Sequence, residues 1–134
     1  MRVAVVARSF VRNASLRAEI QSRYADVSFS DGDAILGGDA LVAFLRGHDA
    51  AIVGLERIDD HILSQVPELT IISKYGVGLD GVEVEALARR GVRLAWTGGV
   101  NRRSVAELTV SFAIALLHRV PEITFGLREG QWLK

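Results

Sequence analysis

Residues 69–81 have the sequence Leu69-Thr70-Ile71-Ile72-Ser73-Lys74-Tyr75-Gly76-Val77-Gly78-Leu79-Asp80-Gly81. The first five residues form an apolar run of strand length, and the rest is a loop that contains three glycines. Glu83 to Arg90 then predicts a helix that Gly91 ends, and Val92 to Ala95 predicts another strand. A strand, a helix and a second strand in this order are typical of a parallel sheet with helical crossover connections.

The same alternation extends back to the amino terminus. Three further strands are predicted at Val3 to Ala7, Val27 to Ser30 and Ala50 to Val53. Three further helices are predicted at Ala14 to Tyr24, between a capping Asp39 and Gly47, and at Asp59 to Val66. The pattern therefore predicts an α/β domain with a flavodoxin-like, parallel five-stranded sheet, flanking helices and the strand order 2-1-3-4-5.

The composition excludes several classes of function. The chain has 134 residues, 49% of them hydrophobic, and 16 basic residues balance 16 acidic ones. With a formal net charge of zero, we expect binding to neither nucleic acid nor membranes. The absence of cysteine excludes disulfides, thiolate nucleophiles and cysteine-based zinc sites. No two of the three histidines have metal-ligand spacing, so no metal site is predicted.

The amino-terminal sequence bears on location. The apolar run from Val3 to Ala7 meets Arg8 too early for the apolar core of a signal peptide or for a membrane span. We therefore expect a cytoplasmic protein.

The last third of the chain departs from the alternation of strands and helices. Ser104 to Val120 predicts one long helix, and Ser104 with Glu107 matches a capping box at its start. Apolar side chains point in nearly every direction around this helix: Val105, Ala106, Leu108, Val110, Phe112, Ala113, Ile114, Ala115, Leu116 and Leu117. A helix that is apolar all round must be buried all round.

A five-stranded sheet offers such a helix only one surface. We therefore expect a further partner surface, either the rest of a longer polypeptide or a second copy of the chain in a dimer. A core helix wrapped by its own loops is the alternative. Residues 1–103 are predicted to form the flavodoxin-like domain, and residues 104–134 a crossover helix and the start of another domain.

Ligands of open parallel sheets bind beyond the carboxyl ends of the strands, which is where the glycine loop is expected. Gly76 and Gly78 would leave backbone N–H groups accessible to a carboxylate or a small phosphate, and Lys74 adds a positive charge. A turn that needs positive φ angles and binds nothing is the alternative. Gly76, Gly78 and Gly81 also match the dinucleotide pattern G-x-G-x-x-G, but the next strand, which Trp96 follows, ends without the acidic residue that holds the ribose.

Four motifs in order carry a family resemblance. They are Ile72 to Asp80, Arg90-Gly91-Val92, Asn101 to Leu108, and Gly130-Gln131-Trp132. The chain resembles the D-isomer-specific 2-hydroxyacid dehydrogenases, with phosphoglycerate dehydrogenase-like members the most similar. The resemblance implies a substrate-binding domain followed by a helix that crosses into a separate Rossmann domain, which holds NAD or NADP.

The resemblance also implies roles for individual residues. The N–H groups around Val77 and Gly78 would hold the substrate carboxylate, within the loop formed by Lys74, Tyr75, Gly76, Val77 and Gly78. Asn101 would line the substrate cleft, and Val105 and Glu107 would lie near the nicotinamide. The catalytic arginine, glutamate and histidine of the family would follow Trp132, so no catalytic residue is predicted in this chain.

Two functional hypotheses follow. The first is the substrate-binding portion, natural or truncated, of an NAD-dependent oxidoreductase that acts on the CH–OH group of small D-2-hydroxy acids and reduces 2-oxo acids in reverse. This chain alone is then expected to be inactive. The second is a stand-alone, non-catalytic module that binds anions or dimerises through its apolar helix. The identity of the acid and the choice between NAD and NADP stay open.

Overall fold

The computed structural model describes residues 1–132, so the last two positions of the predicted 104–134 segment lie outside it. The described chain forms two compact units, Met1–Gly98 and a unit that begins at Gly99. Each unit is described separately below.

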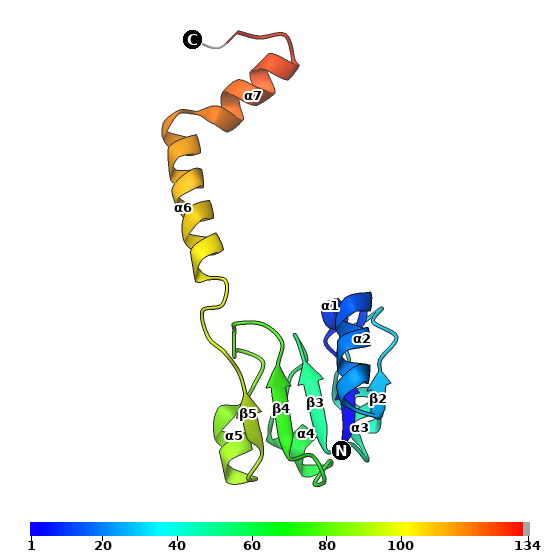
Figure 1. The fold of residues 1–134 in the computed structure, drawn as a ribbon. Helices are drawn as coiled ribbons and strands as arrows, with labels where there is room; N and C mark the ends of the chain where they lie inside the picture. The colour runs from blue at the N-terminus through cyan, green and yellow to red at the C-terminus, as the bar shows by residue number, and fades with distance from the viewer. Residues whose placement is uncertain (133–134) are drawn as a thin grey trace. The chain divides into compact units, whose positions relative to one another are not determined.

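The first unit is built on a parallel five-stranded sheet with the order β2-β1-β3-β4-β5 (Figure 1). The strands are β1 (Arg2–Val5), β2 (Asp26–Phe29), β3 (Ala50–Val53), β4 (Ile71–Lys74) and β5 (Arg93–Ala95). Every neighbouring pair is parallel, and the register aligns Val3 of β1 with Ala50 of β3 and Ala50 with Ile71 of β4. The predicted fold class and strand order are confirmed.

Helices cover both faces of this sheet. They are α1 (Arg8–Val11), α2 (Ala14–Arg23), α3 (Gly38–Leu45), α4 (Asp60–Ser64) and α5 (Val84–Arg89). Successive residues of a strand point to opposite faces, so β1 contributes Val3 and Val5 to one core cluster and Ala4 to the other. Side chains of α1 and α2 complete the first cluster, and those of α3, α4 and α5 complete the second.

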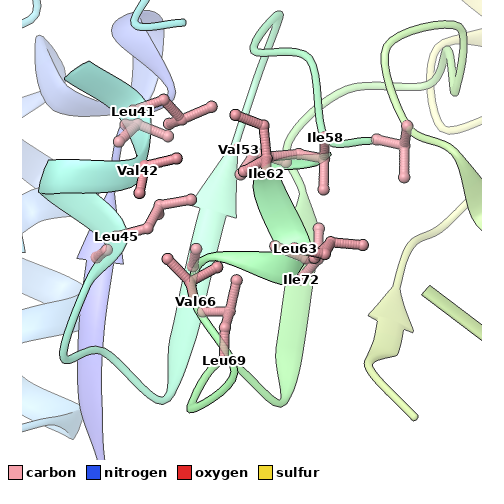
Figure 2. Close-up of a cluster of buried hydrophobic side chains, with 14 of the residues drawn as sticks. Leu41, Val42, Leu45, Val53, Ile58, Ile62, Leu63, Val66, Leu69 and Ile72 are labelled. Carbon is pink, nitrogen blue, oxygen red and sulfur yellow. The ribbon is translucent and has the colours of Figure 1, made fainter. Parts of the chain in front are cut away.

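Figure 2 shows the larger cluster, where α3 and α4 pack against β3 and β4. Leu41, Leu45, Ile58, Leu69 and Ile72 are among its fully buried side chains. Each is worth roughly 1.5–3 kcal/mol when fully buried, so this cluster fixes the central strands and the loops that leave them.

The helices of this unit differ from the prediction in two places and agree with it in others. The sequence analysis did not predict α1, because a four-residue helix is too short to show a helical period. Gly37, not Asp39, occupies the N-cap of α3, and Asp39 lies in the first turn without capping it. The predicted helix ends are confirmed at Gly47 and Gly91, whose φ angles are +79° and +69°.

The second unit consists of two helices, α6 (Arg102–Leu117) and α7 (Val120–Arg128). The single helix predicted from Ser104 to Val120 is therefore wrong at both ends. The break is at Arg119, which adopts a left-handed conformation with φ of +52°, and Pro121 lies in the first turn of α7.

The predicted capping box is also wrong. Asn101 occupies the N-cap position of α6, and no side chain caps the helix. Because α6 begins two residues earlier than predicted, Ser104 lies inside its first turn. Glu107 instead accepts a hydrogen bond of 2.7 Å from Arg103 Nε.

The second unit buries no side chain of α6. Its apolar residues, including Phe112, Leu116 and Leu117, are left uncovered by α7. No single helix within residues 1–132 is both long enough and apolar enough to cross a bilayer. The two helices α6 and α7 meet those criteria only when they are joined, and they are bent by 63° relative to each other.

Candidate functional site

A cavity of about 780 Å³ lies within the first unit, at the carboxyl ends of three neighbouring strands. It is lined by residues that follow β1 (Arg8, Ser9 and Arg12), β3 (Gly54, Leu55 and Glu56) and β4 (Lys74, Tyr75, Gly76, Val77, Gly78, Asp80 and Gly81), together with Ile35. This is the edge of a parallel sheet at which ligands of such folds bind.

The loop after β4 lines this cavity and contains free backbone donors. Tyr75 N donates to Val53 O at 2.8 Å, which ties the start of the loop to the end of β3. The next three N–H groups, those of Gly76, Val77 and Gly78, donate to no acceptor within residues 1–132. Gly76 has a φ of +126°, a conformation that only glycine adopts readily. Three consecutive unpaired N–H groups at a cavity are a recognised way to bind an anion.

Trp96 holds the loop from its outer side. Its indole Nε1 donates to Val77 O at 3.2 Å, so the carbonyl of Val77 is engaged while its N–H group is free. Tyr75 packs edge-on against Phe10 of α1, with ring centroids 5.5 Å apart. The carbonyl of Val77 and the side chain of Tyr75 thus support the loop, and neither contact uses a free N–H group.

Lys74 and Glu56 hold the backbone of Gly54 between them. Lys74 Nζ donates to Gly54 O at 2.5 Å, and Gly54 N donates to Glu56 Oε2 at 2.6 Å. A Cβ atom at Gly54 would lie 3.3 Å from Ala7 Cα, so glycine allows the turn after β3 to approach the end of β1. These contacts join the ends of β1, β3 and β4 at the base of the cavity.

Two arginines of α1 and its C-cap supply the remaining positive charges of the lining. Arg12 pairs with Asp33 at 3.4 Å, and both side chains are well exposed. Arg8 has no carboxylate within 4.0 Å among the described residues. An anion in this cavity would therefore meet Arg8 and Lys74 as well as the free N–H groups.

The structure brings together five of the predicted site residues. Lys74, Tyr75, Gly76, Val77 and Gly78 all line the one cavity. That they bind a substrate stays a prediction.

The other three predicted residues belong to the second unit. Asn101 precedes α6, and Val105 and Glu107 lie within that helix. Their predicted roles toward substrate and cofactor stay predictions too.

The sequence analysis missed the contributions of Arg8, Arg12 and Glu56. The signal for Arg8 was available, since it follows the first predicted strand and the carboxyl ends of neighbouring parallel strands meet at one edge. Glu56 carried no comparable signal, because a lone acidic residue in a loop is typically exposed, and only the folded chain shows that Glu56 is buried.

Gly81, the third glycine of the G-x-G-x-x-G pattern, has a packing role. A Cβ atom at Gly81 would lie 3.1 Å from Glu56 O, and Ile58 N donates to Gly81 O at 2.8 Å, so Gly81 serves the packing of two loops. The strand that follows, β5, leads to Trp96 and offers no carboxylate for a ribose. Within residues 1–132, no three acidic or histidine side chains gather into a metal-binding cluster.

Comparison with known proteins agrees with this architecture. Residues 4–127 match the model of the D-isomer specific 2-hydroxyacid dehydrogenase catalytic domain. Glyoxylate reductase from Aeropyrum pernix is 35% identical over 115 residues, which are 85% of this chain and 34% of that protein.

Solved structures share the fold. The TT0316 protein from Thermus thermophilus has a TM-score of 0.79 and 28% identity, over all of this chain and 42% of that one. The NAD+-bound 3-phosphoglycerate dehydrogenase of Entamoeba histolytica has a TM-score of 0.65 over 86% of this chain and 38% of that one, and at 22% identity this likeness shows the fold alone.

This chain spans about a third of the glyoxylate reductase that it matches. The family model, in contrast, covers nearly all of the chain, including the strands and the glycine loop that form the cavity. The chain belongs to the D-isomer specific 2-hydroxyacid dehydrogenase family.

Proposed function

We propose that this chain is the substrate-binding portion of an NAD-dependent oxidoreductase that acts on the CH–OH group of small D-2-hydroxy acids and, in reverse, reduces 2-oxo acids. The observation that carries the proposal is the row of three free N–H groups at Gly76, Val77 and Gly78, residues that line one cavity together with Lys74. Membership of the family supports the reaction type.

The chemistry of these groups suits the carboxylate that all 2-hydroxy acids share. Hydrogen bonds from N–H groups to an ionised oxygen are shorter and roughly twice as strong as those between neutral partners. The Lys74 ammonium adds an attraction that needs no particular direction, whereas the N–H groups fix the orientation of the carboxylate. A carboxylate held in this way presents the neighbouring carbon, which carries the hydroxyl or oxo group, to the open side of the cavity.

Hydride transfer is assigned to parts of the enzyme other than this cavity. NAD, when bound, would accept or supply the hydride, and the proposal assigns its binding to a site other than Gly76 to Gly81. The proposal places Asn101 at the substrate cleft and Val105 and Glu107 toward the nicotinamide, as the family resemblance implies. The 134-residue chain by itself is then inactive, which accords with its covering 34% of glyoxylate reductase.

A titration with glyoxylate tests the binding role. In ¹H–¹⁵N NMR spectra of the chain, we expect saturable shifts that are largest for the N–H groups of Gly76, Val77 and Gly78. Lys74→Met keeps the aliphatic stem and removes the charge, and we expect it to weaken binding by about tenfold, since one charged hydrogen-bonding group is worth roughly 1.5–3 kcal/mol. Shifts spread evenly over the surface, or unchanged binding by the variant, would contradict the proposal.

A turnover assay tests the division of labour. The chain, supplied with NADH and either glyoxylate or pyruvate, is expected to oxidise no NADH above the background of buffer alone. Robust activity that purifies with the chain would show that the catalytic groups lie within these 134 residues and would overturn this part of the proposal.

A non-catalytic module is the second candidate, favoured by the apolar side chains of α6 that the second unit leaves uncovered. Such a module would use α6 to form a dimer. Sedimentation distinguishes the two candidates, because a discrete dimer that still binds glyoxylate supports the module, whereas heterogeneous association supports a portion of a larger enzyme.

A further inference from the structure

We infer that the cavity selects 2-hydroxy and 2-oxo acids that carry a single negative charge, and that Glu56 is the residue that disfavours a second one. This inference rests on the proposed function and narrows its substrate class. The cavity should bind simple monocarboxylates more tightly than dicarboxylates or phosphorylated acids that contain the same 2-hydroxy acid group.

Glu56 is a buried carboxylate at the cavity. Only 1% of the residue is exposed, yet it lines the cavity together with Gly54 and Lys74. Its Oε2 atom accepts from Gly54 N at 2.6 Å. Its Oε1 atom is buried and has no hydrogen-bond partner within residues 1–132. A carboxylate that is held in this way cannot turn away from an incoming anion.

The cavity has only a small excess of positive charge in its lining. Three cations line it, Arg8, Arg12 and Lys74, and two carboxylates do so, Glu56 and Asp80. Asp33, which does not line the cavity, lies 3.4 Å from Arg12. The lining thus carries three positive and two negative charges, one of the positive ones already paired, so a second anionic group on the ligand would gain little net attraction here.

Asp80 brings a negative charge close to the free N–H groups. A Cβ atom built on Gly78 would lie 2.9 Å from Asp80 Oδ2, so this carboxylate lies next to one of the three residues proposed to bind the ligand's carboxylate. Glu56 and Asp80 belong to the two loops that follow β3 and β4. A ligand held between these loops therefore meets a carboxylate from each of them.

The rest of the lining suits an uncharged tail. Ile35, Leu55 and Tyr75 line the cavity and are 48%, 78% and 40% exposed, so apolar atoms face the solvent at its opening. Arg8 and Lys74 are lining cations with no carboxylate within 4.0 Å among the described residues. Lys74 is assigned to the shared carboxylate, so Arg8 is the group through which a second anionic charge could still be favoured.

Coulomb repulsion gives the inference a quantitative form. The repulsion between Glu56 and a ligand is the sum over the ligand's charges, each divided by its distance, so a dianion whose two charges lie at similar distances from Glu56 is repelled about twice as strongly as a monoanion. If removal of the Glu56 charge changes the affinity for a monoanion by a given factor, it should change the affinity for a dianion by about the square of that factor.

The experiment compares two acids of equal carbon number, 2-oxopentanoate and 2-oxoglutarate. Their dissociation constants for the 134-residue chain come from NMR shifts of Gly76, Val77 and Gly78. We expect the native chain to bind 2-oxopentanoate about tenfold more tightly than 2-oxoglutarate. Glu56→Gln, which has the same shape and can still accept from Gly54 N, should tighten 2-oxopentanoate about threefold and 2-oxoglutarate about tenfold.

Glu85→Gln is the matched control. It removes the same charge from the exposed start of α5, outside the cavity lining, and both affinities should change less than twofold. Asp80→Asn provides a second test at an exposed lining residue, in case the buried substitution at Glu56 prevents folding. Asp80→Asn should raise the affinity for 2-oxoglutarate by a larger factor than the affinity for 2-oxopentanoate.

The outcomes separate this inference from the proposed function. If the native chain binds 2-oxoglutarate as tightly as 2-oxopentanoate, or if Glu56→Gln and Asp80→Asn leave the ratio of affinities unchanged, the inference is wrong while the binding role stands. If neither acid shifts the N–H groups of Gly76, Val77 and Gly78, the proposed function fails and the inference fails with it.

Discussion

Gly76 occupies the most restrictive backbone position of the candidate site. Its φ is +126°, and an added Cβ atom would lie 3.4 Å from Lys74 Nζ. Gly76→Ala should therefore lower the free energy of unfolding by about 1–3 kcal/mol, since that is the typical cost of a strained backbone conformation. Urea denaturation of the two proteins measures the difference. Equal unfolding free energies would show that the loop adopts another conformation.

Single residues also mark how far the site could be predicted from the sequence. Lys74 to Gly78 were predicted as a group because their spacing is local: a strand, then glycines, then a helix. Glu56 could not be predicted, because its role depends on burial and on hydrogen bonding that the packing of β1, β3 and β4 produces. Ser104 and Glu107, in contrast, were assigned a role that the structure does not show. Their four-residue pattern matched a capping box, but α6 begins earlier.

At the scale of elements, an ion pair joins α4 to α5. Arg90 donates to Asp60 through two hydrogen bonds of 2.8 and 2.9 Å, and these lower the pKa of Asp60 from its ordinary value. A lowered folded-state pKa stabilises the fold above the unfolded pKa of about 3.9, and this stabilisation is lost as the pH falls through the folded value.

Asp60→Asn should therefore destabilise the chain at neutral pH and have little effect in acid. Urea midpoints measured at pH 7 and near pH 2 check this expectation. A difference between variant and native chain that is the same at both pH values would show that Asp60 acts through something other than its charge.

Whole elements were easier to predict than their ends. The five strands follow from apolar runs, and their order follows from the flavodoxin-like arrangement that the alternation of strands and helices predicts; neither depends on any single residue. The bounds of α6 depend on one left-handed residue, Arg119, and on which backbone group begins the helix. Small energy differences decide at which residue a helix begins or ends, and the pattern of hydrophobic residues does not contain this information.

At the scale of the whole molecule, α6 lacks cover within its own unit. Burial of one large apolar side chain is worth roughly 1.5–3 kcal/mol, so several of them in water favour association. Phe112→Glu should therefore reduce self-association of the chain in sedimentation experiments, whereas Ser111→Glu, which adds the same charge at a polar neighbour, should reduce it less. A native chain that stays monomeric at high concentration would contradict this expectation.

We propose that the main chain after β4 binds a small acid and that the cofactor is held elsewhere. Crystals of the 134-residue chain grown with both glyoxylate and NADH test it most directly. We expect density for the acid, with its carboxylate on the N–H groups of Gly76, Val77 and Gly78, and no nucleotide on Gly76 to Gly81. A nucleotide bound to that loop, or glyoxylate bound only at another site, would contradict it.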